Sequence, residues 1–164
     1  MNELKSKGIF KIKHFRDGVL LDEWEQPNDV TLEGKNAMLD NMFNAGTQSS
    51  NWYVGLINNA GFTAVAESDV YTSHAGWTEL TNFSQTTRQL WNKGAAASKT
   101  VTSSTTSVFT INATCAVIGI FLANSNVKGQ TSGSFILWAT TVFGAVRNFV
   151  SGDTLAITYT SALL

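Results

Sequence analysis

The chain has 164 residues, a length typical of one domain. Its single cysteine, Cys115, excludes an intrachain disulfide framework, and its two histidines leave few ligands for a zinc enzyme. The 11 basic and 12 acidic residues argue against a strongly basic nucleic-acid-binding protein. Only 14% of the residues are charged, but 43% are hydrophobic and 11% aromatic, so the chain is not of the disordered class.

The charged residues are concentrated near the N-terminus. Residues 1–40 hold fourteen of the 23 charged side chains, and the other 124 residues hold nine. The chain instead contains fifteen Ser and twenty Thr. Because Thr favours strands and Ser favours turns, the composition predicts β-structure with a hydroxyl-rich surface. Two explanations stay open at this point: an ordinary Thr-rich β-sandwich, or a surface that faces other protein chains.

The N-terminal segment is predicted to form a β-hairpin over residues 7–25. Arg16-Asp17-Gly18 suits a three-residue loop with Gly18 in the left-handed conformation. That loop would place Phe10 opposite Trp24, and the lysine after Phe10 opposite Glu23. A two-residue loop would mix charged and apolar faces, so we prefer the three-residue loop. No signal peptide is expected, because no apolar core follows the first five residues.

Pro27 is predicted to end the hairpin, and a helix to run from about Thr31 to Phe43. Its plausible N-caps are Asn28, Asp29 and Thr31. Gly34 weakens this helix by up to ~1 kcal/mol relative to Ala, and Gly46 is a natural stop. The helix has an apolar stripe that we expect to be buried: Leu32, Ala37, Met38, Leu39, Met42 and Phe43.

Short strands are predicted from residue 51 onward, with an irregular excursion over 62–86 and a polar loop over 124–133. Ala116–Ala123 is apolar on both faces and therefore central; it is far shorter than the ~20 residues of a membrane span, so no membrane partner is expected. The other predicted strands are Trp52–Ile57, Arg88–Trp91, Lys99–Thr102, Ser107–Asn112, Ser134–Val142 and Thr154–Ser161.

These elements predict a mainly β fold of about eight strands, a sandwich or barrel-like arrangement of jelly-roll type, with an N-terminal β-hairpin and one α-helix. The chain would comprise a hairpin–helix module over residues 1–46 and a β-sandwich over residues 47–164, packed together as one domain.

Catalytic signatures are absent from the sequence. Neither a phosphate-binding Gly-x-x-x-x-Gly-Lys nor a His-Glu-x-x-His motif occurs. Asp69 and His74 lie five residues apart, but a metal needs three or four ligands. Cys115 precedes an apolar strand and is expected to behave as a small buried hydrophobic residue. We therefore expect no catalytic, cofactor-binding or metal-binding residues and no cofactor.

Candidate partner contacts are of two kinds. Trp77 follows Gly76 in the irregular excursion and is a candidate exposed aromatic, for a protein interface or for a sugar. A basic cluster near the N-terminus is a candidate for docking onto a larger protein, although it can also be a solvated face; nearby carboxylates offset its charge, so nucleic acid is not expected as a partner. The cluster comprises Lys5, Lys7, Lys11, Lys13 and Arg16.

Several runs resemble small virion structural proteins of tailed bacteriophages that are encoded beside the major capsid protein. They are Asp29–Phe43 (DVTLEGKNAMLDNMF), Gly46–Gln48 (GTQ), Trp52–Ile57 (WYVGLI), His74–Trp77 (HAGW), Gly119–Leu122 (GIFL) and Gly152–Thr160 (GDTLAITYT). The similarity spans nearly the whole chain, and its motifs are structural patterns rather than catalytic signatures.

Some proteins of this kind resemble capsid decoration or cement proteins. The resemblance implies a non-enzymatic protein, made in the bacterial host cytoplasm, that binds the capsid surface of the virion. Its implied partners are the major capsid protein and its own copies, as a homotrimer suited to local threefold positions. Two alternatives remain: a tail or neck component, such as a fibre or adaptor subunit, and a carbohydrate-binding module.

Overall fold

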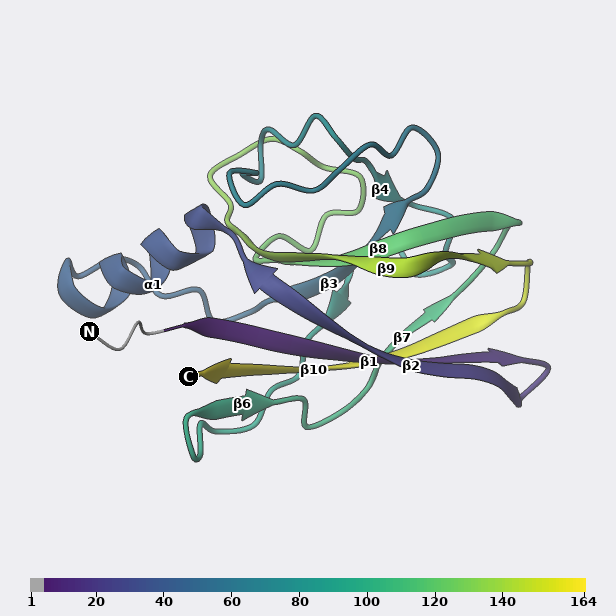
Figure 1. The fold of residues 1–164 in the computed structure, drawn as a ribbon, viewed down its shortest axis with the longest axis horizontal. Coiled ribbons are helices and arrows are strands. Elements are labelled where there is room, and N and C mark those ends of the chain that lie inside the picture. Colours follow the sequence, from purple (N-terminus) through teal and green to yellow (C-terminus); the bar gives the residue numbers. More distant parts are fainter. Residues whose placement is uncertain (1–4) are drawn as a thin grey trace.

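A computed structural model describes residues 5–164, so the first four residues of the predicted N-terminal module lie outside the described part. The predicted mainly β fold with one helix is confirmed, with ten strands in that part of the chain (Figure 1). No helix among the described residues is long and apolar enough to cross a membrane. The elements are β1 (Ser6–Arg16), β2 (Val19–Val30), α1 (Leu32–Phe43), β3 (Tyr53–Asn58), β4 (Glu79–Leu80), β5 (Gln89–Leu90), β6 (Thr100–Thr102), β7 (Ser107–Thr110), β8 (Cys115–Ala123), β9 (Leu137–Phe149) and β10 (Thr154–Leu163).

The strands form one antiparallel sheet in the order β4-β3-β8-β9-β2-β1-β10-β6, with β5 added beside β3 and β7 beside β10. β8 lies between β3 and β9, which confirms the central position predicted for residues 116–123. The β9–β2 junction is short, with only Asp29–Thr140 and Val30–Ala139 paired. The two halves of the sheet face each other and enclose the main core.

Alternating side chains of both halves build this core. Phe10 and Ile12 of β1 are fully buried, as are Leu56 of β3 and Ile120 of β8. A second, smaller core covers the opposite face of β3 and β8. There, the segments 59–78 and 124–136 pack over the sheet, above β8 and β9 in Figure 1. The predicted irregular excursion is therefore a covering layer with its own apolar contacts.

The β1–β2 turn differs from the prediction. Arg16 pairs with Val19, so the loop has only two residues, Asp17 and Gly18. Both have positive φ, 51° and 76°, as a type I′ hairpin turn requires. The predicted three-residue loop is therefore wrong.

A β-bulge at Leu21 then resets the register of this hairpin. The pairing shifts between His14 and Phe15, which leaves Leu21 as the extra residue of β2. Lys11 consequently lies opposite Glu25 and Ile12 opposite Trp24. The bulge restores the separation of charged and apolar faces that a plain two-residue turn would have lost.

Pro27 does not end β2, which continues to Val30. It ends the ladder between β2 and β9 instead. Pro27 lies two residues before Asp29, the last paired residue on that side of the ladder, and it has no N–H to donate. The Thr141 hydroxyl donates to the Pro27 carbonyl at 2.6 Å, and no further residues of the two strands pair.

The helix begins as predicted, but its apolar stripe is not buried. Thr31 is the N-cap, and its hydroxyl oxygen accepts the Gly34 N–H at 3.0 Å. Gly34 is the one buried residue of α1 and lies against the Trp138 backbone. The helix therefore packs by its first turn, and the rest extends past the sheet (Figure 1). Leu39 is 48% exposed and Met42 70% exposed, so the predicted buried face is wrong.

Candidate functional site

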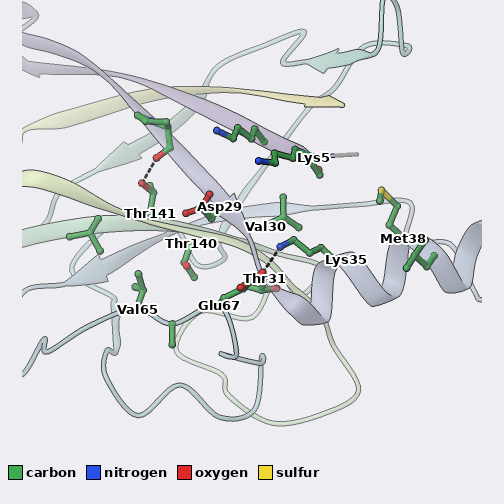
Figure 2. Close-up of a pocket in the computed structure, with 16 residues that line it drawn as sticks. Lys5, Asp29, Val30, Thr31, Lys35, Met38, Val65, Glu67, Thr140 and Thr141 are labelled. Atoms are coloured by element: carbon green, nitrogen blue, oxygen red, sulfur yellow. Dashed lines mark hydrogen bonds and ion pairs between the residues drawn. The ribbon is translucent and has the colours of Figure 1, made fainter. Parts of the chain in front are cut away.

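A groove of about 820 Å³ lies between α1, the start of β1, the end of β2 and β9 (Figure 2). Its position follows from the short β2–β9 ladder, because the two strands pair only at Asp29 and Val30 and are not paired on the N-terminal side of Asp29. Val30, Val65 and Val142 contribute apolar surface, and Met38 and Leu39 of α1 form one wall. Its remaining lining residues are mainly polar: Lys5, Ser6, Lys7, Pro27, Asp29, Thr31, Lys35, Ala66, Glu67, Thr140 and Thr141.

An ion pair ties the wall of the groove to the covering segment. Lys35 pairs with Glu67, as Figure 2 shows, and the Leu32 N–H donates to the Glu67 carbonyl at 2.9 Å. The lining residues contain three lysines against two carboxylates. They include neither histidine nor cysteine. This combination of apolar surface with a weakly basic rim is suited to binding a protein segment.

The basic cluster predicted from the sequence lies mostly on one face of β1. Lys7, Lys11 and Lys13 alternate with buried residues and are exposed. Lys11 pairs with Glu25 at 2.7 Å and Lys13 with Glu23 at 3.7 Å. The hydrogen bond that Lys11 donates to the Glu25 carboxylate raises the pKa of Lys11. The face is therefore a lysine row beside a carboxylate row, and not a continuous basic patch.

Two further members of the predicted cluster lie apart from this row. Lys5 is exposed beside the C-terminus, where its N–H donates to the Leu164 carbonyl at 3.2 Å. It also lines the groove. Arg16, at the other end of β1, donates to both carboxylate oxygens of Asp153, at 2.7 and 2.9 Å. The structure therefore separates the predicted cluster into a row whose first member, Lys7, also lines the groove, a second groove residue, Lys5, and the structural residue Arg16.

Asp153 is the centre of a buried polar cluster that sequence reasoning missed. Its side chain is fully buried and also accepts from His14 Nε2 at 2.9 Å and the Val150 N–H at 3.0 Å. The hydrogen bonds of Arg16 hold the Asp153 pKa well below its usual range, although burial acts in the opposite direction. The cluster fixes the β9–β10 turn against the end of β1. The pairing of Arg16 with a residue 137 positions later left no local signal in the sequence.

The prediction that Trp77 is an exposed aromatic is wrong. Trp77 is 3% exposed and packs on Phe121 in the second core. Its Nε1–H donates to Asp69 at 2.9 Å, and its carbonyl accepts the His74 Nδ1–H at 3.0 Å. Asp69 and His74, the pair considered for a metal, therefore position Trp77. Among residues 5–164, no group of three His, Cys, Asp or Glu side chains is placed to hold a metal ion.

Arg88 is a second buried charge that the sequence analysis did not identify. It forms a two-point ion pair with Glu79, at 3.0 and 2.9 Å, and both side chains are buried. It also donates to the Ser125 and Gln130 carbonyls and to the Tyr71 hydroxyl. One arginine thus joins the two covering segments. The sequence did contain a signal for this ion pair. Charged residues are rare after residue 40, so an isolated arginine there can be expected to have an acidic partner.

Cys115 is half-buried and packs against the main core, as expected of a small hydrophobic residue. Burial, and secondarily the charge of Asp153, raises the pKa of its thiol. The thiolate that nucleophilic chemistry needs is therefore disfavoured.

The described residues thus form one groove and two structural polar clusters. No protein-family model matches the chain, and no curated protein matches it.

Proposed function

We propose that the chain is a non-enzymatic structural protein of a tailed-bacteriophage particle, which binds the outer surface of the head and reinforces the capsid. The resemblance across nearly the whole sequence motivates the proposal. The structural observation that supports it best is the uncovered apolar side of α1, where Leu39 and Met42 are exposed. Exposed apolar surface of this kind marks interaction sites.

The proposed partners are the major capsid protein and further copies of this chain as a homotrimer. A protein that binds only the assembled lattice stabilises it by mass action. The row of Lys7, Lys11 and Lys13 beside its carboxylate row is the proposed contact with the capsid. Striped charges of this kind set the register of docking and steer association more than they add affinity.

The test is binding to heads that lack the protein. The purified chain is mixed with undecorated heads, sedimented, and located on them by electron microscopy. The proposal requires many copies on the head lattice and weaker, less salt-dependent binding by Lys11→Glu/Lys13→Glu. The control Lys11→Arg/Lys13→Arg keeps the charges and should bind as the parent does. Absence of the parent from heads, or a few copies confined to the neck or tail, would contradict the proposal in favour of a tail or neck component.

The carbohydrate-binding alternative has less support. Sugar platforms need exposed aromatic rings, but Trp77 and Trp91 are buried, and Trp24, Trp52 and Trp138 are partly buried against other aromatic rings or the core. Specific binding on a glycan array would restore this alternative.

A further inference from the structure

Exposed apolar side chains gather at the two opposite ends of the molecule. One group is at the tip of the β1–β2 hairpin, where Val19 is 61% exposed and Leu21 50% exposed. The other is on α1, where Leu39 and Met42 are exposed. In Figure 1 the tip lies at the right end of the long axis, and α1, which contributes one wall of the groove, lies at the left end. The two surfaces of one molecule therefore do not meet.

The hairpin tip is convex and held in place. An added Cβ at Gly18 would meet nothing within 4 Å, so the turn projects into open space. Behind it, Arg16 is clamped to Asp153, and Asp22 pairs with Arg147 at 2.6 Å. Such anchoring lowers the entropy cost of inserting the tip into another surface.

The groove end is concave and continues onto α1. Met42 follows Met38 by four residues and Leu39 by three, so it lies on the helix face that lines the groove. The apolar wall of the groove therefore extends along the helix beyond the groove itself. This surface is larger than the groove, and its residues Leu39 and Met42 are exposed in the described part of the chain.

The net charges of the two ends have opposite signs. The groove lining carries three lysines and two carboxylates. At the tip and its clamps there are three carboxylates, of Asp17, Asp22 and Asp153, against the two guanidinium groups of Arg16 and Arg147. A contact between two tips would bring Asp17 toward its own copy, whereas a tip in a groove brings unlike charges together.

We propose that the hairpin tip of one copy docks in the groove of a second copy, against α1. This is a heterologous, head-to-tail contact, because each copy uses one end to receive and the other to insert. Such contacts form rings when the rotation between copies closes, and filaments when it does not. A ring of three would be the form compatible with the proposed homotrimer, but the contact itself does not rest on any binding to a phage head.

Two double variants and their mixture test the proposal by sedimentation velocity on purified protein at high micromolar concentration. Val19→Lys/Leu21→Lys alters the tip, and Leu39→Lys/Met42→Lys alters the groove wall with residues that suit a helix. The parent should sediment as a multiple of 17.7 kDa, and each double variant as a single chain. The control Val127→Lys replaces an apolar residue of the 124–136 segment that is 47% exposed, close to Leu39 and Leu21, and should assemble like the parent. Circular dichroism establishes that each variant is folded.

The mixture separates this contact from the other possibilities. An equimolar mixture of the two double variants retains one intact tip and one intact groove per pair. It should form a dimer of twice the single-chain mass and nothing larger. A monomeric parent, a double variant that still assembles, or a mixture that stays monomeric would overturn the proposal, and a double variant that still assembles would favour a symmetric contact between like surfaces. No phage particle enters this experiment, so its failure and a failure to bind heads are distinguishable.

Discussion

Arg16 and Asp153 join two ends of the chain through a paired hydrogen bond, Nε to Oδ1 at 2.7 Å and Nη2 to Oδ2 at 2.9 Å. The arginine remains partly exposed, whereas the carboxylate is fully buried. The carboxylate is therefore the partner that depends on the contact, because a buried charge without compensation is costly. This asymmetry makes Asp153 the better site for a test.

Asp153→Asn should lower the free energy of unfolding by about 2 kcal/mol, because hydrogen bonds to a charged group are lost inside the protein. Urea denaturation measures the effect. Asp17→Asn is the control: Asp17 lies in the exposed turn at positive φ, which Asn tolerates well, so its effect should stay within roughly 0.5 kcal/mol. Equal effects of the two variants would show that the buried cluster contributes no particular stability.

The same carboxylate predicts a dependence of stability on pH. Hydrogen bonds from Arg16 lower the folded-state pKa of Asp153 below its ordinary value of 3.8. A lowered folded pKa gives stability that is fully present above the unfolded pKa and is lost as the pH falls below it. The parent should therefore lose unfolding free energy from about pH 5 downward, and Asp153→Asn should lose less over that range. Parallel curves for the two proteins in urea titrations at each pH would count against the assignment.

The sequence was sufficient for the order of elements because turn residues and alternating apolar residues are local signals. The N-cap at Thr31 and the central strand β8 are of this kind. The hairpin register was not accessible, because the bulge at Leu21 compensates for the two-residue turn only once the strands are paired. Local patterns report which residues can pair, but not where an extra residue is accommodated.

Burial was the other property that the sequence did not settle. The stripe containing Leu39 and Met42 was recognised as apolar, but periodicity does not say whether the covering surface belongs to the same chain. The prediction for Trp77 was wrong in the opposite direction: it was expected to be exposed but is buried, because the residues that cover it come from segments distant in sequence. The candidate groove could not be predicted from a sequence pattern, because its lining residues come from five separate segments.

Gly34 offers a test in which helix propensity and packing oppose each other. Alanine has the higher helix propensity, yet a Cβ at this position would lie 2.6 Å from the Trp138 carbonyl oxygen. That oxygen belongs to backbone in β9 and cannot move aside cheaply. Gly34→Ala should therefore destabilise the protein by about 1–3 kcal/mol, the usual range for overpacking. Asn36→Ala, on the exposed side of the same helix, should be neutral or slightly stabilising. Thermal unfolding compares the two variants, and a stabilised Gly34→Ala would mean that α1 packs less closely on β9.

The Arg88–Glu79 pair predicts how the second core is held. Removing the arginine leaves the Glu79 carboxylate buried with only the Gly129 N–H, which it accepts at 2.6 Å. Arg88→Met should therefore cost about 3–5 kcal/mol of unfolding free energy. Arg88→Met/Glu79→Gln removes both charges and should be less destabilised than Arg88→Met alone, because no unpaired charge remains.

A second measurement locates the effect of Arg88 in the covering layer. Arg88 donates to the Ser125 and Gln130 carbonyls, so its loss should loosen the 124–136 segment before the main core unfolds. Limited proteolysis under native conditions should then cut Arg88→Met within that segment, while the parent and Asp17→Asn stay intact. Cleavage of Arg88→Met elsewhere first, or a loss of stability below about 1 kcal/mol, would be incompatible with Arg88 as the link between the two covering segments. Recovery of protease resistance in the double variant would assign the loosening to the stranded carboxylate, whereas continued cleavage would assign it to the missing hydrogen bonds.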